Sequence, residues 1–282
     1  MSWNTLISVD EFAEAIDRCV VIDARHDLMV PGAGRAAYEE GHIPGAFFLG
    51  QDTDLSATKN GRNGRHPLPD PDTLAATLRA TGLEPARQLV VYDAQNGMFA
   101  SRVWWLARWL GHEAVAVLDG GIEAWRKAGF PVSREIPASR AGTFSASPSR
   151  APSVDASALL ANIDTQDRLV VDARAPERYR GEVEPLDPVA GHIPGAVNRP
   201  VQVNLRPDGR FKPGPVLRQE FEGLLAGRPA SALVHACGSG ISACHNLLAM
   251  EHAGLRGSAL YPGSWSEWCA DPSRPVATGP TP

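Results

Sequence analysis

Short apolar runs recur along the chain, and most of them are rich in β-branched residues without polar alternation. They span residues 19–23, 88–93, 114–119, 169–173, 231–236 and 258–261. Such runs suit the strands of a parallel sheet, because helices cover both faces of that kind of sheet. Segments 9–17, 72–82 and 101–111 show helical spacing of apolar residues, and Gly82 and Gly111 are placed as helix stops. The pattern therefore predicts an α/β fold.

Three sequence blocks occur twice in the same order. They are VVIDAR (20–25) with LVVDAR (169–174), EGHIPGAFF (40–48) with AGHIPGAVN (190–198), and VLDGGIEAW (117–125) with LYPGSWSEW (260–268). Ordered repetition at this long offset indicates duplication of a whole domain rather than a solenoid. Between the copies, segment 131–153 is rich in Pro, Ser, Ala and Arg and lacks apolar periodicity. We expect two tandem domains, 1–136 and 154–282, joined by a linker at 137–153, each a mainly parallel sheet flanked by helices.

Composition narrows the class of protein. The chain has 282 residues, 43% of them hydrophobic and 21% charged, and a net charge of −5. This mild acidity disfavours nucleic acid and membrane surfaces as partners, since both attract a basic face. No apolar run approaches the roughly 18 residues of a membrane span, and the N-terminus does not resemble a secretory signal. Four cysteines are too few for a disulfide framework, so we expect a cytoplasmic protein.

The segment around Cys237 has the pattern of a reactive-cysteine loop. Cys237 follows the predicted strand 231–236 and precedes a helical pattern, so it lies at the carboxyl end of a parallel strand, where α/β sheets bind ligands. Gly238 and Gly240 allow a tight turn with converging amides, and the helix start adds partial positive charge. Such a cradle stabilises a thiolate or a persulfide anion. We predict a nucleophilic, sulfur-carrying Cys237; the alternative is a small buried hydrophobic residue.

Other chemistry fits this loop less well. A phosphate-binding cysteine loop closes with an arginine, and none follows Cys237 as far as His245. Cysteine spacing also does not match a metal site. Cys244 lies about two helical turns on, where it is either a resolving thiol or, as we favour, a packed helix residue. Cys19 and Cys269 are expected to be structural.

Taken together, these motifs resemble the tandem-domain rhodanese-type sulfurtransferases over essentially the whole chain. The HIPGA repeats and YPGSWSEW match signatures of that family, and CGSGISAC (237–244) resembles the active-site loop of its 3-mercaptopyruvate branch. The resemblance implies that Cys237 takes sulfur from the donor as a persulfide and releases pyruvate. A thiol, thioredoxin or cyanide then accepts the sulfur, and no metal or organic cofactor takes part. It also implies a silent first domain, because Asp93 stands in the place of Cys237.

The family also implies a set of substrate-binding residues. Arg178 would grip the anionic donor, with a surface arginine as the alternative, and the loop residues Gly238, Gly240, Ile241 and Ser242 would surround the sulfur. The 3-mercaptopyruvate branch usually carries a second arginine where this chain has Leu186 and Asp187, which leaves Arg180 as a substitute. This difference keeps thiosulfate open as the alternative donor, although 3-mercaptopyruvate is favoured.

A proton relay is the last expectation from the family. His66 matches the histidine of the branch and Asp52 the aspartate that orients it, with Asp54 as a rival for the second role. Together they would relay a proton through Ser239. The alternative for His66 is a solvent-facing loop histidine. Ser239 is also a candidate cap for the following helix, a role compatible with the first. The alternative to an enzyme is a sulfur-carrier or partner-binding protein, in which another protein loads Cys237 with sulfur.

Overall fold

The structure is a computed structural model, and it describes residues 2–281. The chain forms two compact units that are not continuous in sequence. The first unit comprises the chain up to Ala57, Pro69–Arg150 and the short piece Pro207–Arg210. The second comprises Thr58–Leu68, Ala151–Arg206 and the chain from Phe211 onward. Segment 58–68 therefore belongs to the second unit, although it lies in the first half of the sequence.

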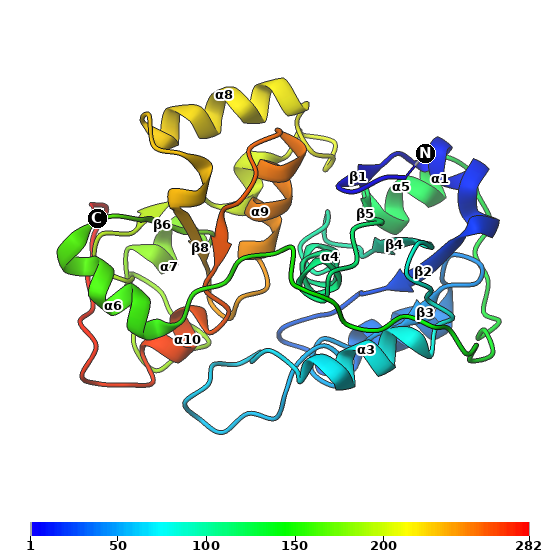
Figure 1. Cartoon of the computed structure of the whole chain (residues 1–282), viewed down its shortest axis with the longest axis horizontal. Coiled ribbons are helices and arrows are strands. Elements are labelled where there is room, and N and C mark those ends of the chain that lie inside the picture. The colour runs from blue at the N-terminus through cyan, green and yellow to red at the C-terminus, as the bar shows by residue number, and fades with distance from the viewer. Residues whose placement is uncertain (1, 282) are drawn as a thin grey trace. The chain divides into compact units, whose positions relative to one another are not determined.

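The first unit is built around a five-stranded sheet of order β1-β5-β4-β2-β3, and every neighbouring pair in it is parallel (Figure 1). Its strands are β1 (Leu6–Ile7), β2 (Cys19–Asp23), β3 (Phe47–Phe48), β4 (Gln88–Tyr92) and β5 (Val115–Leu118). Its helices are α1 (Val9–Ala15), α2 (Ala33–Glu40), α3 (Pro71–Arg79), α4 (Ala100–Trp109) and α5 (Gly121–Lys127). The five residues of β2 are all buried, as the unbroken apolar run predicts.

Local sequence signals fix several helix ends. Ser8 and Glu11 form a reciprocal capping box at the start of α1, and the Asp70 side chain accepts from Thr73 N at the start of α3. A short 3₁₀ turn, η1 (Ile16–Arg18), continues α1. Gly111 follows α4 at φ +84°, a conformation that glycine adopts at little cost and that stops the helix.

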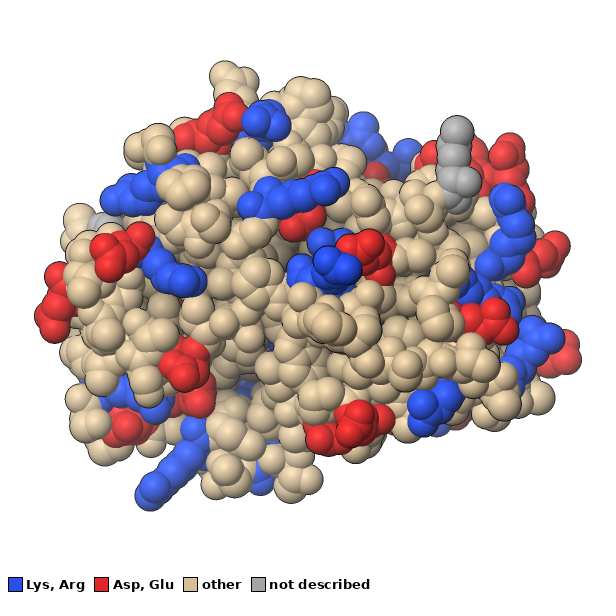
Figure 2. All heavy atoms as spheres, viewed as in Figure 1, with Lys and Arg blue, Asp and Glu red and all other residues tan. Residues whose placement is uncertain are grey.

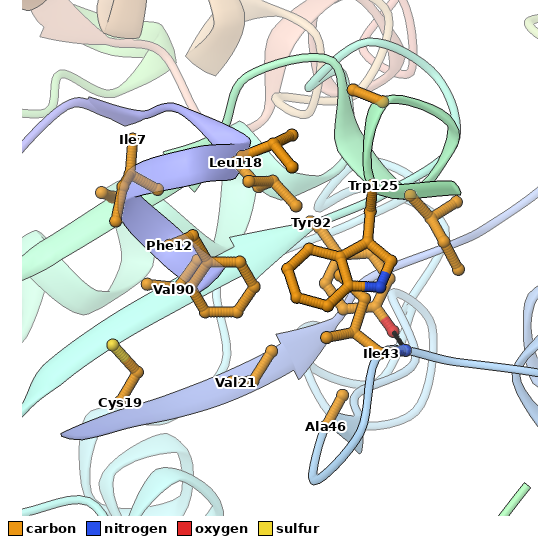
Figure 3. Packing of buried hydrophobic residues seen from close by; sticks show 14 of the residues in the cluster. Ile7, Phe12, Cys19, Val21, Ile43, Ala46, Val90, Tyr92, Leu118 and Trp125 are labelled. Atoms are coloured by element: carbon orange, nitrogen blue, oxygen red, sulfur yellow. Dashed lines mark hydrogen bonds between the residues drawn. The ribbon is translucent and has the colours of Figure 1, made fainter. Parts of the chain in front are cut away.

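Apolar side chains from four strands (β1, β2, β4 and β5) and two helices (α1 and α5) form the core of the first unit (Figure 3). Phe12 of α1 packs against Trp125 of α5, with ring centroids 5.3 Å apart. Val21 and Val90 lie in the same cluster and are 3% and 0% exposed. Burying each such side chain contributes roughly 1.5–3 kcal/mol, so this cluster holds the helices to one face of the sheet.

The second unit repeats this plan with a parallel sheet of order β7-β6-β8-β9 (Figure 1). Its strands are β6 (Leu169–Asp172), β7 (Val197–Asn198), β8 (Leu233–Ala236) and β9 (Ala259–Leu260). Its helices are α6 (Ala156–Thr165), α7 (Pro176–Tyr179), α8 (Gly214–Leu225), α9 (Ala243–His252) and α10 (Ser264–Trp268), with 3₁₀ turns η2 (Val201–Asn204) and η3 (Ala230–Ala232). The prediction of an α/β fold made twice is confirmed.

The repeated GHIPGA segments carry structural histidines. His42 Nδ1 lies 2.8 Å from Tyr38 O, and the two rings stack at 3.9 Å. His192 Nδ1 makes the same 2.8 Å contact with Tyr179 O, and those rings stack at 3.8 Å. Both histidines are fully buried, so they fix a turn in each copy rather than serve one site.

The segment between the copies has no helix or strand of its own over residues 131–153, and it makes backbone hydrogen bonds to the first unit. Arg140 N donates to Ala80 O at 3.1 Å, Phe144 N to Leu83 O at 3.0 Å, and Ser147 N to Leu110 O at 3.0 Å. The Phe144 side chain is buried. These bonds satisfy backbone groups beyond the ends of α3 and α4, and they explain why the first unit extends to Arg150.

On the face shown in Figure 2, acidic and basic side chains are interspersed among uncharged residues. Within residues 2–281, no helix combines the length and the apolar character that a membrane crossing requires.

Candidate active site

Cys237 lies directly after β8, at the carboxyl end of a strand that pairs with β6 and β9. The residue is buried, with 1% of its surface exposed. Its backbone N donates to Ser264 Oγ at 3.1 Å, and its backbone O accepts from Trp265 N at 2.9 Å. The YPGSWSEW motif therefore holds the cysteine loop in place, which explains why the two motifs occur together.

The thiol of Cys237 faces an amide of its own loop. Gly240 N donates to Sγ at 3.1 Å, and Ser264 Oγ lies 3.9 Å from the same sulfur. Gly240 has φ +78°, and a Cβ there would overlap Pro262 O. Only glycine fits this position without a rearrangement. The predicted tight turn with an inward amide is present, and α9 begins shortly after it at Ala243.

The other cysteines are packed residues. Cys244 Sγ donates to Gly240 O at 3.3 Å within α9, and the side chain is fully buried. Burial raises the pKa of Cys19, and it raises the pKa of Cys269 to about 11. None of the four cysteines forms a disulfide.

Segment 58–68 brings His66 to the cysteine loop. His66 Nδ1 lies 2.8 Å from Ser239 Oγ, and both side chains are buried. Arg65 N donates to Ser266 Oγ at 3.0 Å, which anchors the segment beside α10 (Figure 1). Helix α9 has Ser242 as its N-cap residue and no side-chain cap, so Ser239 does not cap it. His66 is also not solvent-facing, and the expected His66–Ser239 pair is formed.

The two candidate carboxylates for orienting His66 belong to the first unit. Asp52 lies 3.8 Å from His26 Nε2, and about half of its side chain is exposed. Asp54 accepts from Gly50 N at 2.7 Å and from Thr53 Oγ1 at 2.9 Å, so it stabilises its own turn. The orienting role of Asp52 stays a prediction.

Arg178 lies over the cysteine loop and is not a surface arginine. A Cβ on Gly238 would be 3.6 Å from both Nη atoms of Arg178, whose side chain is 17% exposed. Arg178 donates from Nη2 to Glu184 Oε1 at 2.6 Å, and Arg174 Nη1 lies 3.3 Å from Glu184 Oε2. Glu184 is 3% exposed, so a buried carboxylate positions both arginines. Ile241 and Ser242, the remaining predicted loop residues, continue the chain toward α9.

Two residues of this arrangement, Arg65 and the carboxylate that holds it, had no role assigned from the sequence. Arg65 Nη1 donates to Asp187 Oδ1. Asp187 is 3% exposed, and burial raises its pKa while Arg65 acts in the opposite direction. Only the position of Arg65 next to His66 could have drawn attention to it. Arg180, the substitute considered from sequence, instead forms an exposed pair with Glu182 through Nε and Nη2 at 2.7 and 2.8 Å.

The corresponding loop of the first unit has a carboxylate in place of the thiol. Asp93 follows β4 and accepts from four backbone N–H groups, all at 2.8–2.9 Å. The donors are Gln95, Gly97, Phe99 and Ala100. Burial raises the pKa of Asp93, and these four donors act against that shift. The first unit thus has a comparable set of loop amides, but here the Asp93 carboxylate accepts all four of these hydrogen bonds.

With its duplicated sheets and repeated strand-end cradles, the chain belongs to the rhodanese-like domain family, which it matches over residues 8–128 and again over 155–271. It is 47% identical to a probable 3-mercaptopyruvate sulfurtransferase of Pseudomonas aeruginosa, over 99% of this chain and 100% of that protein. It is 38% identical to a putative thiosulfate sulfurtransferase, SseB, of Mycobacterium tuberculosis, over 98% of each chain. The crystal structure of the 3-mercaptopyruvate sulfotransferase SseA from Escherichia coli superposes with a TM-score of 0.79 and 31% identity, covering 93% of this chain and 99% of that one.

Proposed function

We propose that this protein is a sulfurtransferase that moves sulfur from 3-mercaptopyruvate, through a persulfide on Cys237, to a thiol, thioredoxin or cyanide. The observation that carries this proposal is the Gly240 N–H directed at Cys237 Sγ, 3.1 Å away, at the carboxyl end of β8. An amide aimed at a buried sulfur favours its anionic forms, which both halves of the reaction need. The relatives named as sulfurtransferases cover the full length of the chain and support the same chemistry.

In the first half-reaction, the Cys237 thiolate attacks the sulfur of the donor. A bond forms between Sγ and that sulfur, the donor carbon–sulfur bond breaks, and the electron pair stays on carbon as the enolate of pyruvate. The enolate then takes up a proton to give pyruvate. Ser239 Oγ and His66 Nδ1, 2.8 Å apart, form a path for that proton, with Asp52 proposed to orient the imidazole.

In the second half-reaction, the thiolate of the acceptor attacks the outer sulfur of the persulfide. The sulfur–sulfur bond breaks, Cys237 returns to its thiolate, and the acceptor carries the sulfur away. With cyanide the product is thiocyanate. In each half-reaction one bond to the transferred sulfur forms as another breaks, so the proposed cycle calls for no external oxidant or reductant.

Charge around the loop favours a monoanionic donor. Arg178 is proposed to bind the carboxylate, while Gly238, Gly240, Ile241 and Ser242 surround the sulfur. Glu184 and Asp187 lie behind the arginines and lower the local positive charge. A dianion such as thiosulfate would find less compensation there than a carboxylate does. Thiosulfate remains the second candidate, because the Mycobacterium tuberculosis relative carries that name.

The two repeats have different roles in this proposal. The copy at 154–282 is catalytic, whereas the copy at 1–136 does not turn over, because the Asp93 carboxylate cannot carry sulfane sulfur. The linker assigned to 137–153 connects them. We place the protein in the cytoplasm, where the reducing environment keeps the four cysteines out of disulfides.

Steady-state assays with both donors test this function. We expect the wild type to release pyruvate from 3-mercaptopyruvate much faster than it releases sulfite from thiosulfate, and Cys237→Ser to abolish both. After donor treatment, mass spectrometry should find one added sulfur atom on Cys237. Faster sulfite release would favour the thiosulfate alternative, and turnover retained by Cys237→Ser would reject the covalent mechanism. Loading only by a partner protein would support the carrier alternative.

A further inference from the structure

Two arginine side chains present unpaired nitrogen atoms above the residue that follows Cys237. A Cβ on Gly238 would lie 2.7 Å from Arg65 Nη2 and 3.6 Å from Arg178 Nη1. Arg65 uses Nη1 for Asp187, and Arg178 uses Nε and Nη2 for Glu184. Among residues 2–281, neither Arg65 Nη2 nor Arg178 Nη1 has a hydrogen-bond partner. Each group therefore keeps donors available next to the cysteine loop.

Buried carboxylates hold these two arginines in place. Glu184 and Asp187 are each 3% exposed, whereas Arg65 and Arg178 are 22% and 17% exposed. Asp187 Oδ2 lies 3.7 Å from Arg178 Nη2 and makes no hydrogen bond, so the same carboxylate faces both cations. Two guanidinium groups this close would repel each other without such counter-charge. The buried carboxylates therefore hold the two guanidinium groups in place, and the unpaired nitrogen atoms of Arg65 and Arg178 stay available to a ligand.

We propose that Arg65 is a second donor-binding arginine, which receives the carboxylate of the sulfur donor jointly with Arg178, and that Asp187 is the positioning residue that aims it. This inference rests on the proposed function. A carboxylate has two oxygen atoms, and one guanidinium donor can serve each of them through a charge-assisted hydrogen bond. Arg180 is held in an exposed pair with Glu182, whereas the side-chain atoms nearest a Cβ on Gly238 belong to Arg65 and Arg178.

The geometry also defines the class of donor. The Gly240 amide is directed at sulfur, while the arginine ends lie above Gly238, so the site separates a sulfur-binding part from a carboxylate-binding part. A donor that uses both must carry its transferable sulfur and its carboxylate on different atoms, as a mercapto-carboxylic acid does. A polysulfide carries no carboxylate and would use only the first part.

Replacing Arg65 tests the proposal by separating these two kinds of donor. For Arg65→Gln we expect KM for 3-mercaptopyruvate to rise about tenfold to hundredfold, the loss typical of one charged hydrogen bond, with kcat changed much less. Loading of Cys237 by inorganic polysulfide, followed by mass spectrometry, should keep its wild-type rate. Arg65→Lys should recover part of the lost affinity. The matched control is Arg62→Gln, an exposed arginine on the same segment, which should behave as wild type.

A binding measurement keeps the test independent of turnover. Pyruvate titrated into Cys237→Ser by calorimetry should bind about tenfold or more weakly when Arg65→Gln is added, and Asp187→Asn should weaken binding less. An unchanged KM and unchanged pyruvate affinity in Arg65→Gln would overturn the inference and leave the proposed function standing. An equal loss with polysulfide would show that Arg65 only supports the loop, and would also overturn it. A wild type that releases no pyruvate would instead reject the proposed function.

Discussion

The imidazole Nδ1 of His66 and the hydroxyl Oγ of Ser239 lie 2.8 Å apart, and both side chains are buried. If the pair delivers a proton as one unit, His66→Ala and Ser239→Ala should each lower kcat/KM with 3-mercaptopyruvate by about a hundredfold, at the lower end of acid–base effects. The double variant should lose little more than either single one. Initial rates of pyruvate release measure this. Two losses that multiply would show that the residues act separately.

Replacing Gly240 by alanine should destabilise the protein by more than the positive φ of Gly240 alone explains. In Gly240→Ala the new Cβ would overlap Pro262 O, and we expect a loss of about 2–4 kcal/mol of unfolding free energy together with poor persulfide formation. Gly227→Ala is the control, because Gly227 has φ +86° with nothing within 4 Å of the new Cβ. It should lose about 1–2 kcal/mol from backbone strain alone. Urea denaturation compares the two, and similar losses would refute the steric argument.

Asp93 should matter for the stability of the first unit and not for sulfur transfer. In Asp93→Asn, one acceptor oxygen becomes an NH₂ group that faces backbone donors, so two of the four amides lose their partner. We expect a loss of about 2–4 kcal/mol in the free energy of unfolding, with kcat per folded molecule unchanged. Denaturation followed by active-site-normalised kinetics tests both parts. A changed kcat would mean that the first copy contributes to turnover.

His235 should make the second unit sensitive to acid. Burial lowers the pKa of this fully buried histidine to about 3, below its ordinary value of 6.5. The unfolded chain therefore binds a proton that the folded chain rejects, and stability falls as pH drops from about 6.5 toward 3. At pH 4.5 the loss from this group should reach about 2–3 kcal/mol relative to pH 7.5.

Substituting His235 by leucine tests that account. His235→Leu replaces the titrating group in β8 by an apolar side chain, so its stability should fall less between pH 7.5 and 4.5 than that of the wild type. The change between the two pH values is compared, because packing effects of leucine cancel in that difference. Equal acid sensitivity in both proteins would assign the effect to other groups.

The fold was predictable from the sequence where it depends on local pattern. The run at 19–23 coincides with β2, and the run at 231–236 contains β8, although its first residues form the 3₁₀ turn η3. The two-residue strands β1, β3 and β7 were not predicted, because two residues are too few to show a periodic pattern. They are defined by pairing with β5, β2 and β6, which only the folded sheet supplies.

The site was predictable where a motif encodes it. The glycine loop fixed the position of Cys237, and the resemblance led to His66, Ser239 and Arg178. The position of Arg65 in the site was not predicted, because its partner Asp187 lies far away in sequence and neither residue belongs to a periodic element. From the sequence, Arg180 was the candidate substitute for the second arginine of the branch; the structure pairs Arg180 with Glu182 and brings the Arg65 guanidinium beside Gly238.

The placement of residues 58–68 has a consequence for any division of the chain. A gene fragment that encoded only the later repeat would retain the sulfur-binding cysteine but would lack both His66 and Arg65. Cutting the chain between the repeats would therefore remove residues 58–68 from the unit that holds Cys237 and Pro207–Arg210 from the unit that holds Asp93. Each unit is thus encoded in part by the half of the chain that carries the other.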